Sequence, residues 1–142
     1  MNPKAQQVID ACEADWDANK SDCNAFVRAV AGTIGINIPA GDANFIVDWL
    51  TTQGWDTPSD GTAAEQQAET GQFVIGGLKG ADHIPPRVHG HVVVVVVGPL
   101  AQNKYPSAYW GSLGNVAQKN LTVNMAWVVA DLDNVTYFAH SF

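Results

Sequence analysis

Six consecutive valines, at positions 92–97, constrain the fold of this chain more than any other feature. β-branched side chains favour strands, and a run of this length is far too short for a membrane-spanning helix, which needs about 20 apolar residues. Because no polar residue alternates with the valines, we predict a central strand that is covered on both faces. The chain has 142 residues, enough for one core, so helices are expected to cover at least one of those faces.

Helical periodicity dominates the first half of the chain. Apolar residues recur every three or four positions over residues 5–16 and 23–34, and again between a cap at Asp42 and a stop at Gly54. A short segment rich in Ala, Gln and Glu, residues 62–70, predicts one more helix. We therefore predict that helices fill the chain up to the first strand.

The second half changes to short segments rich in β-branched and aromatic residues, which Gly, Pro and Asn separate. These segments predict a largely antiparallel sheet, and together with the helices they predict an α+β layered domain. No repeat or linker divides the chain, so residues 1–142 are expected to form one domain. The predicted strands are residues 73–75, 92–97, 108–113, 123–129 and 135–138.

Composition excludes several classes of protein. Seven basic and fourteen acidic residues give a formal charge of -7, the wrong sign for binding nucleic acid. No apolar run is long enough for membrane insertion, and the N-terminal residues lack the apolar stretch of a secretory signal, so we expect no signal-dependent export. Two cysteines are too few for a disulfide scaffold or a four-thiolate zinc site, and no metal or other cofactor is expected.

Cys23 is the candidate nucleophile. It follows Ser21 and Asp22 and opens a predicted helix, where backbone N–H groups and the helix dipole favour a thiolate. We therefore expect a lowered thiol pKa and a chemical role, rather than the packing role that most free cysteines have. Cys12 is the contrasting case, because it lies in mid-helix on the apolar stripe and is expected to fill the core.

His91 is the candidate base, because it precedes the valine run and a strand would hold it rigidly within reach of a nucleophile. His89 would share its side of an extended chain, since residues i and i+2 point to the same face. The two histidines are alternatively metal ligands, which requires at least one more ligand nearby. His83, in a loop rich in Gly and Pro, and His140, at the chain end, are expected to be exposed or simply packed.

A cysteine at a helix start, followed along the chain by a histidine on a strand, is the arrangement of papain-like thiol hydrolases. Further motifs extend the match: Ser21-Asp22-Cys23-Asn24-Ala25-Phe26-Val27, Gly41-Asp42-Ala43-Asn44, Gly76-Gly77-Leu78-Lys79-Gly80, Gly90-His91-Val92-Val93-Val94, Gly98-Pro99-Leu100 and Lys104-Tyr105-Pro106. The first of these resembles the catalytic segment of NlpC-type cell-wall peptidases. The whole set resembles the first family of type VI secretion amidase effectors.

The resemblance implies a papain-like fold and a cysteine amidase that cuts peptidoglycan stem peptides between D-glutamate and meso-diaminopimelate. It also implies delivery by the type VI secretion machinery into the periplasm of a rival bacterium, and a periplasmic immunity protein that protects the producer. The expectation of no signal-dependent export agrees with that route. Two alternatives stay open: a phage or housekeeping hydrolase with the same two residues, and a non-catalytic module that binds wall peptides through Trp49, Trp55 or Trp110.

By the resemblance, Cys23 matches the nucleophile of the family and His91 matches its base. Residues 109–112 match the strand that orients the histidine through a polar group or a backbone carbonyl. Trp110 stands there in place of Asn, Asp or Gln, so its backbone carbonyl is the expected orienting group. The residues expected to border the substrate groove are Asp22, His89 and Ser112.

Overall fold

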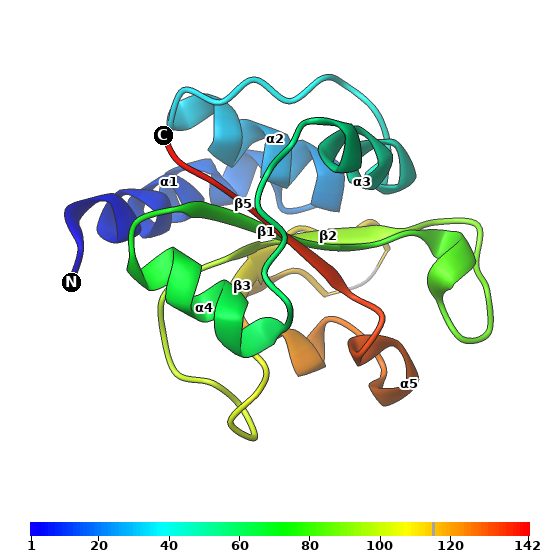
Figure 1. Cartoon of the computed structure of the whole chain (residues 1–142). Helices are drawn as coiled ribbons and strands as arrows, with labels where there is room; N and C mark the ends of the chain where they lie inside the picture. The colour runs from blue at the N-terminus through cyan, green and yellow to red at the C-terminus, as the bar shows by residue number, and fades with distance from the viewer. Residues whose placement is uncertain (115) are drawn as a thin grey trace.

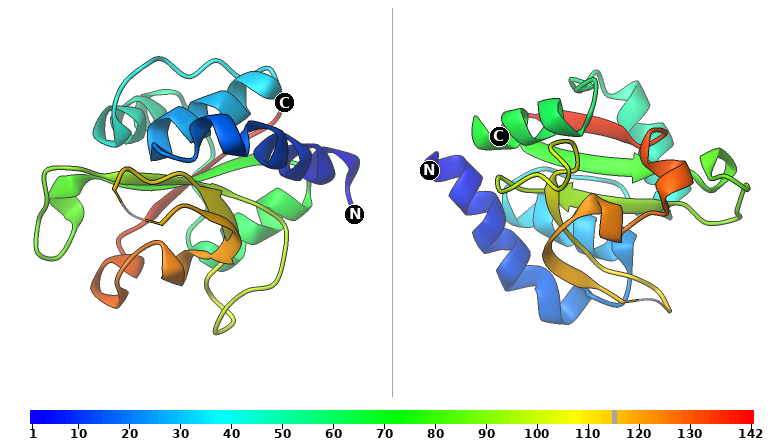
Figure 2. Two further views of the ribbon diagram at one scale, coloured as in Figure 1. Left: turned by 180° about the vertical axis from the view of Figure 1, so that it is seen from behind. Right: turned by 90° about the horizontal axis from the view of Figure 1, so that it is seen from below.

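The computed structural model describes residues 1–114 and 116–142. A five-stranded antiparallel sheet forms the middle layer, with the strand order β4-β3-β2-β1-β5. Helices α1 to α3 cover one face, while α4 and the short α5 lie on the other (Figure 1 and Figure 2). This is the α+β layered domain that the sequence predicts, and it is consistent with a papain-like fold.

Polar side chains begin each of the four long helices by accepting hydrogen bonds from the N–H groups of the first turn. The N-terminal caps are Asn2, Asp22, Asp42 and Asp60. These four helices agree with the predicted segments to within about three residues, whereas α5 was not predicted. The helices are α1 (Pro3–Asn19), α2 (Cys23–Thr33), α3 (Ala43–Thr52), α4 (Gly61–Glu69) and α5 (Val129–Leu132).

β2 is the central strand, as the valine run predicts. Val92 and Val94 face the core under α1 to α3, whereas Val93 and Val95 face the core that contains residues of α4, and all four are fully buried. The strands are β1 (Phe73–Leu78), β2 (His91–Val95), β3 (Ser107–Trp110), β4 (Gln118–Thr122) and β5 (Thr136–His140).

The predicted strand at residues 123–129 is wrong. This segment forms a 3₁₀ turn, Val123–Met125, and then leads into α5. Val123 and Trp127 both turn into the core, and their spacing of four is that of a helix rather than a strand. The edge strand on this side of the sheet is β4, just upstream. Its polar sequence has little strand propensity, and backbone pairing with β3 holds it in place.

The predicted strand at residues 108–113 also ends early, because β3 stops at Trp110 and the chain leaves the sheet at Gly111. The valine run continues past the end of β2, although the N–H of Val96 still donates to the Ser107 carbonyl (2.9 Å). In the part of the chain described here, no helix combines the length and the apolar character needed to cross a membrane.

Candidate functional site

Cys23 is the first residue of α2. The Asp22 carboxylate caps this helix by accepting hydrogen bonds from the N–H groups of Asn24 (3.0 Å) and Ala25 (3.5 Å). The cap fixes the direction in which the helix begins, and the dipole places its positive end at the thiol. The candidate nucleophile therefore stands on a rigid element, at the position that the sequence predicts.

The start of α2 lies where β2 and β3 separate. Toward the His91 end of β2, the last residue pair between β2 and β3 is Val94 with Tyr109. At the other end of β2, the N–H of Val96 points toward β3. Because N–H groups alternate in direction along a strand, the N–H of Val92 also points to the β3 side. β3 has left the sheet there, and the Val92 N–H meets the Cys23 thiol instead.

Gly111 gives α2 the space to enter this gap. A Cβ atom on residue 111 would lie 2.6 Å from the backbone oxygen of Asp22. The next residue, Ser112, donates its backbone N–H to the Lys20 carbonyl (2.9 Å). The structure therefore brings two of the expected groove residues, Asp22 and Ser112, together at the start of α2.

Burial raises the pKa of the Cys23 thiol above its ordinary value, and the charge of Asp22 adds to the rise. The N–H groups of Val92 and Asn24 act in the opposite direction but do not outweigh burial. The predicted lowering of this pKa is therefore wrong for the free protein, in which the thiol is neutral. Cys12 fills the core as predicted: it is fully buried, and burial raises the pKa of its thiol as well.

His91 is the first residue of β2, and two indole rings hold its imidazole. The ring centroid lies 5.3 Å from that of Trp127 and 6.4 Å from that of Trp110, both in edge-on contacts. Burial, followed by the positive charge of His83, lowers the pKa of His91 to about 4. The imidazole is therefore neutral at pH 7, which is the form that accepts a proton.

Cys23 lies next to the peptide bond that joins His91 to Val92. The thiol lies against the N–H of Val92, the residue directly after His91. Among the described residues no hydrogen bond joins the thiol to the imidazole, so the two groups are neighbours without direct contact. Catalytic hydrogen bonds are often long in free enzymes and shorten when substrate binds. A sulfur nucleophile with an imidazole base is the chemistry that these groups supply.

The loop before β2 does not bring His89 into the sheet. His89 is exposed and precedes the strand, so the alternation that relates residues i and i+2 does not apply to it. Asn44 holds this loop, because it accepts a hydrogen bond from the Gly80 N–H (2.8 Å) and donates one to the Val88 carbonyl (2.9 Å). The role of Asn44 is thus to fix the segment that leads into His91.

His83 and Asp131 form a buried pair that the sequence does not predict. His83 is 4% exposed, and its Nδ1 lies 2.7 Å from Oδ2 of Asp131, which is 1% exposed. The other Asp131 oxygen accepts the N–H of Ile84 (2.7 Å). Of the two expectations for His83, packing is confirmed and exposure is wrong. No local pattern joins residues that lie 48 positions apart, so the sequence carries no sign of this pair.

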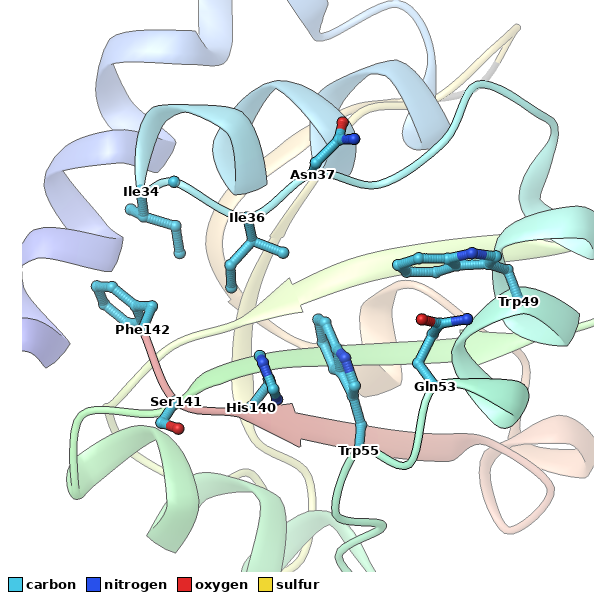
Figure 3. A pocket seen from close by; sticks show the side chains of 10 residues that line it. Ile34, Ile36, Asn37, Trp49, Gln53, Trp55, His140, Ser141 and Phe142 are labelled. Atoms are coloured by element: carbon cyan, nitrogen blue, oxygen red, sulfur yellow. The ribbon is translucent and has the colours of Figure 1, made fainter.

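A separate hollow of about 500 Å³ lies at the other end of α2 and involves the C-terminal residues (Figure 3). Trp49, Trp55 and His140 line it, and the His140 ring stacks on Trp55 with 4.8 Å between centroids. The candidate nucleophile and base do not line this hollow. In the described parts of the chain, no three His, Cys, Asp or Glu side chains gather as a metal site requires.

Helices packed on an antiparallel sheet, with a cysteine at a helix start beside a strand that opens with histidine, form the arrangement of papain-like proteins. No protein-family model matches the chain. It is 38% identical to the peptidoglycan amidase Tse1 of Pseudomonas aeruginosa over 151 aligned residues, which cover 99% of this chain and 94% of the relative. The chain therefore belongs to the first family of type VI secretion amidase effectors, as its motifs indicate.

Proposed function

We propose that this protein is a peptidoglycan amidase that hydrolyses the bond between D-glutamate and meso-diaminopimelate in stem peptides, with residues 1–142 as its catalytic domain. A relative that aligns with nearly the whole chain is named a peptidoglycan amidase. The observation that carries the cysteine mechanism is the thiol of Cys23, at a capped helix start and against the N–H that follows His91. The choice of bond rests on the family resemblance.

Cys23 and His91 divide the acyl transfer between them. The neutral imidazole takes the thiol proton as the sulfur attacks the side-chain carbonyl carbon of D-glutamate. The imidazolium then gives this proton to the departing amine of diaminopimelate, and a thioester remains on the sulfur. Water, deprotonated by His91, cleaves the thioester, which releases the glutamate carboxyl group and returns a proton to the thiol.

The start of α2 stabilises the charge that develops during attack. The carbonyl oxygen becomes an oxyanion, and the backbone N–H of Cys23 is a donor at the positive end of the helix dipole. By the family resemblance, the backbone carbonyl of Trp110 is the group expected to orient His91, and the Trp110 indole packs edge-on against the imidazole. In this proposal the stem peptide lies in a groove bordered by Asp22, His89 and Ser112.

The family also indicates where the enzyme acts. We infer that type VI secretion machinery delivers the protein into the periplasm of target cells, where peptidoglycan is exposed to it. A periplasmic immunity protein would then protect the producing cell. A gene for a signal-bearing partner beside the gene for this chain supports this route, and its absence favours a phage or housekeeping hydrolase.

Digestion of purified sacculi tests the proposed function. The wild-type protein should release peptides that begin with a free diaminopimelate amine, and mass analysis of the products identifies the bond. Cys23→Ala should abolish release, whereas Cys12→Ala, the matched control in the core, should retain it if the variant is folded. Cleavage at the cross-link between diaminopimelate and D-alanine would contradict the bond assignment. Activity that disappears with a chelator and returns with zinc would contradict the cysteine mechanism.

A further inference from the structure

His83 lies in the loop between β1 and β2, and Asp131 fixes its ring. Burial alone would raise the pKa of Asp131, but hydrogen bonds from the Ile84 N–H and from His83 hold it below its ordinary value. The carboxylate is therefore ionised and only accepts hydrogen bonds, so Nδ1 of His83 carries the proton. The other ring nitrogen, Nε2, is buried and has no hydrogen-bond partner among the described residues.

The buried His83 and the half-buried His91 both lie against the segment that begins at Trp127. Trp127 packs against the His91 ring with 5.3 Å between centroids, and Asp131, four residues further along the chain, holds His83 (2.7 Å). A positive charge on His83 would lower the pKa of His91, so the two rings lie within electrostatic reach of each other. A single short segment therefore contacts both imidazoles, and it brings the unpartnered nitrogen of His83 into the neighbourhood of the catalytic base.

The half-buried His91 imidazole has no hydrogen-bond partner among the described residues. A catalytic histidine needs a hydrogen bond at its second ring nitrogen, which fixes the tautomer and aims the first nitrogen at the nucleophile. No side-chain hydrogen bond to His91 is formed by the described residues, and the backbone carbonyl of Trp110 makes none. The buried Nε2 of His83 lacks a hydrogen-bond donor, and the His91 imidazole lacks an acceptor among the described residues, so each could satisfy the other.

We propose that His83, held by Asp131, is a positioning residue for His91: in the substrate complex, Nε2 of His83 accepts a hydrogen bond from the His91 N–H that faces away from Cys23. The chain of contacts then runs from Asp131 through both imidazoles to the thiol. His83 keeps its own proton on Nδ1 throughout, and no bond to it is made or broken. This inference rests on the proposed function, because it requires the chemistry of Cys23 and His91.

The pH dependence of the rate tests whether His83 acts on His91. Cys23 faces it from α2 and His83 from the loop, with Asp131 and Arg87 behind His83. The flanking indoles carry no charge. In the substrate complex the neutral His83 accepts a hydrogen bond from His91, which favours the imidazolium, so removing His83 should move the acid limb of kcat to lower pH. A residue with only a structural role would lower the profile without moving that limb.

Two substitutions at one position separate positioning from packing. His83→Gln retains one donor for Asp131 and one acceptor for His91, whereas His83→Leu has neither at a similar size. We expect His83→Leu to lower kcat for a soluble muropeptide at least ~10-fold with little change in KM, and His83→Gln to recover most of that loss. His140→Ala, at an exposed histidine outside the site, is the control and should match the wild type.

The double variant His83→Leu/Asp131→Asn keeps the test valid if the single variant fails to fold, because it leaves no unpaired buried carboxylate. It should show the same loss of kcat and the same shifted acid limb while it unfolds at a temperature close to that of the wild type. Equal kcat and an unmoved limb in both folded variants would overturn the inference and leave the carbonyl of Trp110 as the orienting group. Full activity of Cys23→Ala would instead overturn the proposed function.

Discussion

Replacing Gly111 by alanine tests how Cys23 is positioned. The added Cβ atom would lie 2.6 Å from the backbone oxygen of Asp22 and 2.9 Å from that of Asn19. Both neighbours are backbone atoms, so no side chain can rotate away and either α2 or residue 111 has to move. Overpacking of this kind costs about 1–3 kcal/mol, which corresponds to a Tm lower by roughly 3–12 °C in a chain of this size.

The same movement separates the thiol from the Val92 N–H. A displacement of about 1 Å at a reacting group lowers the rate roughly 10²-fold, so Gly111→Ala should lose activity out of proportion to its loss of stability. Muropeptide hydrolysis at a temperature well below Tm, measured together with thermal unfolding, separates the two effects.

Gly32→Ala is the matched control for this experiment. Gly32 lies in α2, and its added Cβ would meet nothing within 4 Å. Alanine is also the better helix former by about 1 kcal/mol, so this variant should be at least as stable as the wild type and equally active. If Gly111→Ala matches the wild type in both measurements, the gap between β2 and β3 is not tight, and our explanation of the position of Cys23 is wrong.

Three further predictions follow from the site. Iodoacetamide at neutral pH should label Cys23 before the fully buried Cys12, as peptide mass analysis would show; the reverse order means that the two thiols are wrongly assigned. His91→Ala should lower hydrolysis at least ~10²-fold and His89→Ala much less, and equal losses would bring His89 into the site. The free energy of unfolding should fall by up to about 3 kcal/mol as the pH drops from about 6.5 to about 4, because the unfolded chain then binds a proton that His91 in the folded protein does not. Urea unfolding of the wild type and His91→Gln checks this last prediction, and parallel pH dependences would refute it.

The positions of the candidate nucleophile and the central strand could be predicted because short-range physics determines them. A cap at Asp22 and an apolar stripe are local patterns, and they predict a helix that begins at Cys23. Six valines without polar alternation likewise predict a strand buried on both faces, which β2 is.

The environment of the site could not be predicted, because it depends on long-range contacts. The desolvation that raises the pKa of Cys23 follows from how α2 packs on the sheet, whereas the sequence shows only the helix start that lowers it. The pairing of His83 with Asp131 joins a loop to α5, a helix of four residues with no periodic pattern. The edge strand β4 is polar and is specified by its backbone pairing with β3 rather than by its side chains.

The raised pKa of the Cys23 thiol affects how readily this residue is oxidised outside a reducing cytoplasm. Peroxides and disulfides react with thiolates, and low-pKa cysteines that face solvent are the ones that oxidise to sulfenic acid or mixed disulfides. A thiol whose pKa is raised by burial offers little thiolate to such oxidants. In the proposed mechanism this thiol is therefore shielded while no substrate is bound, and it becomes reactive when the His91 imidazole takes its proton.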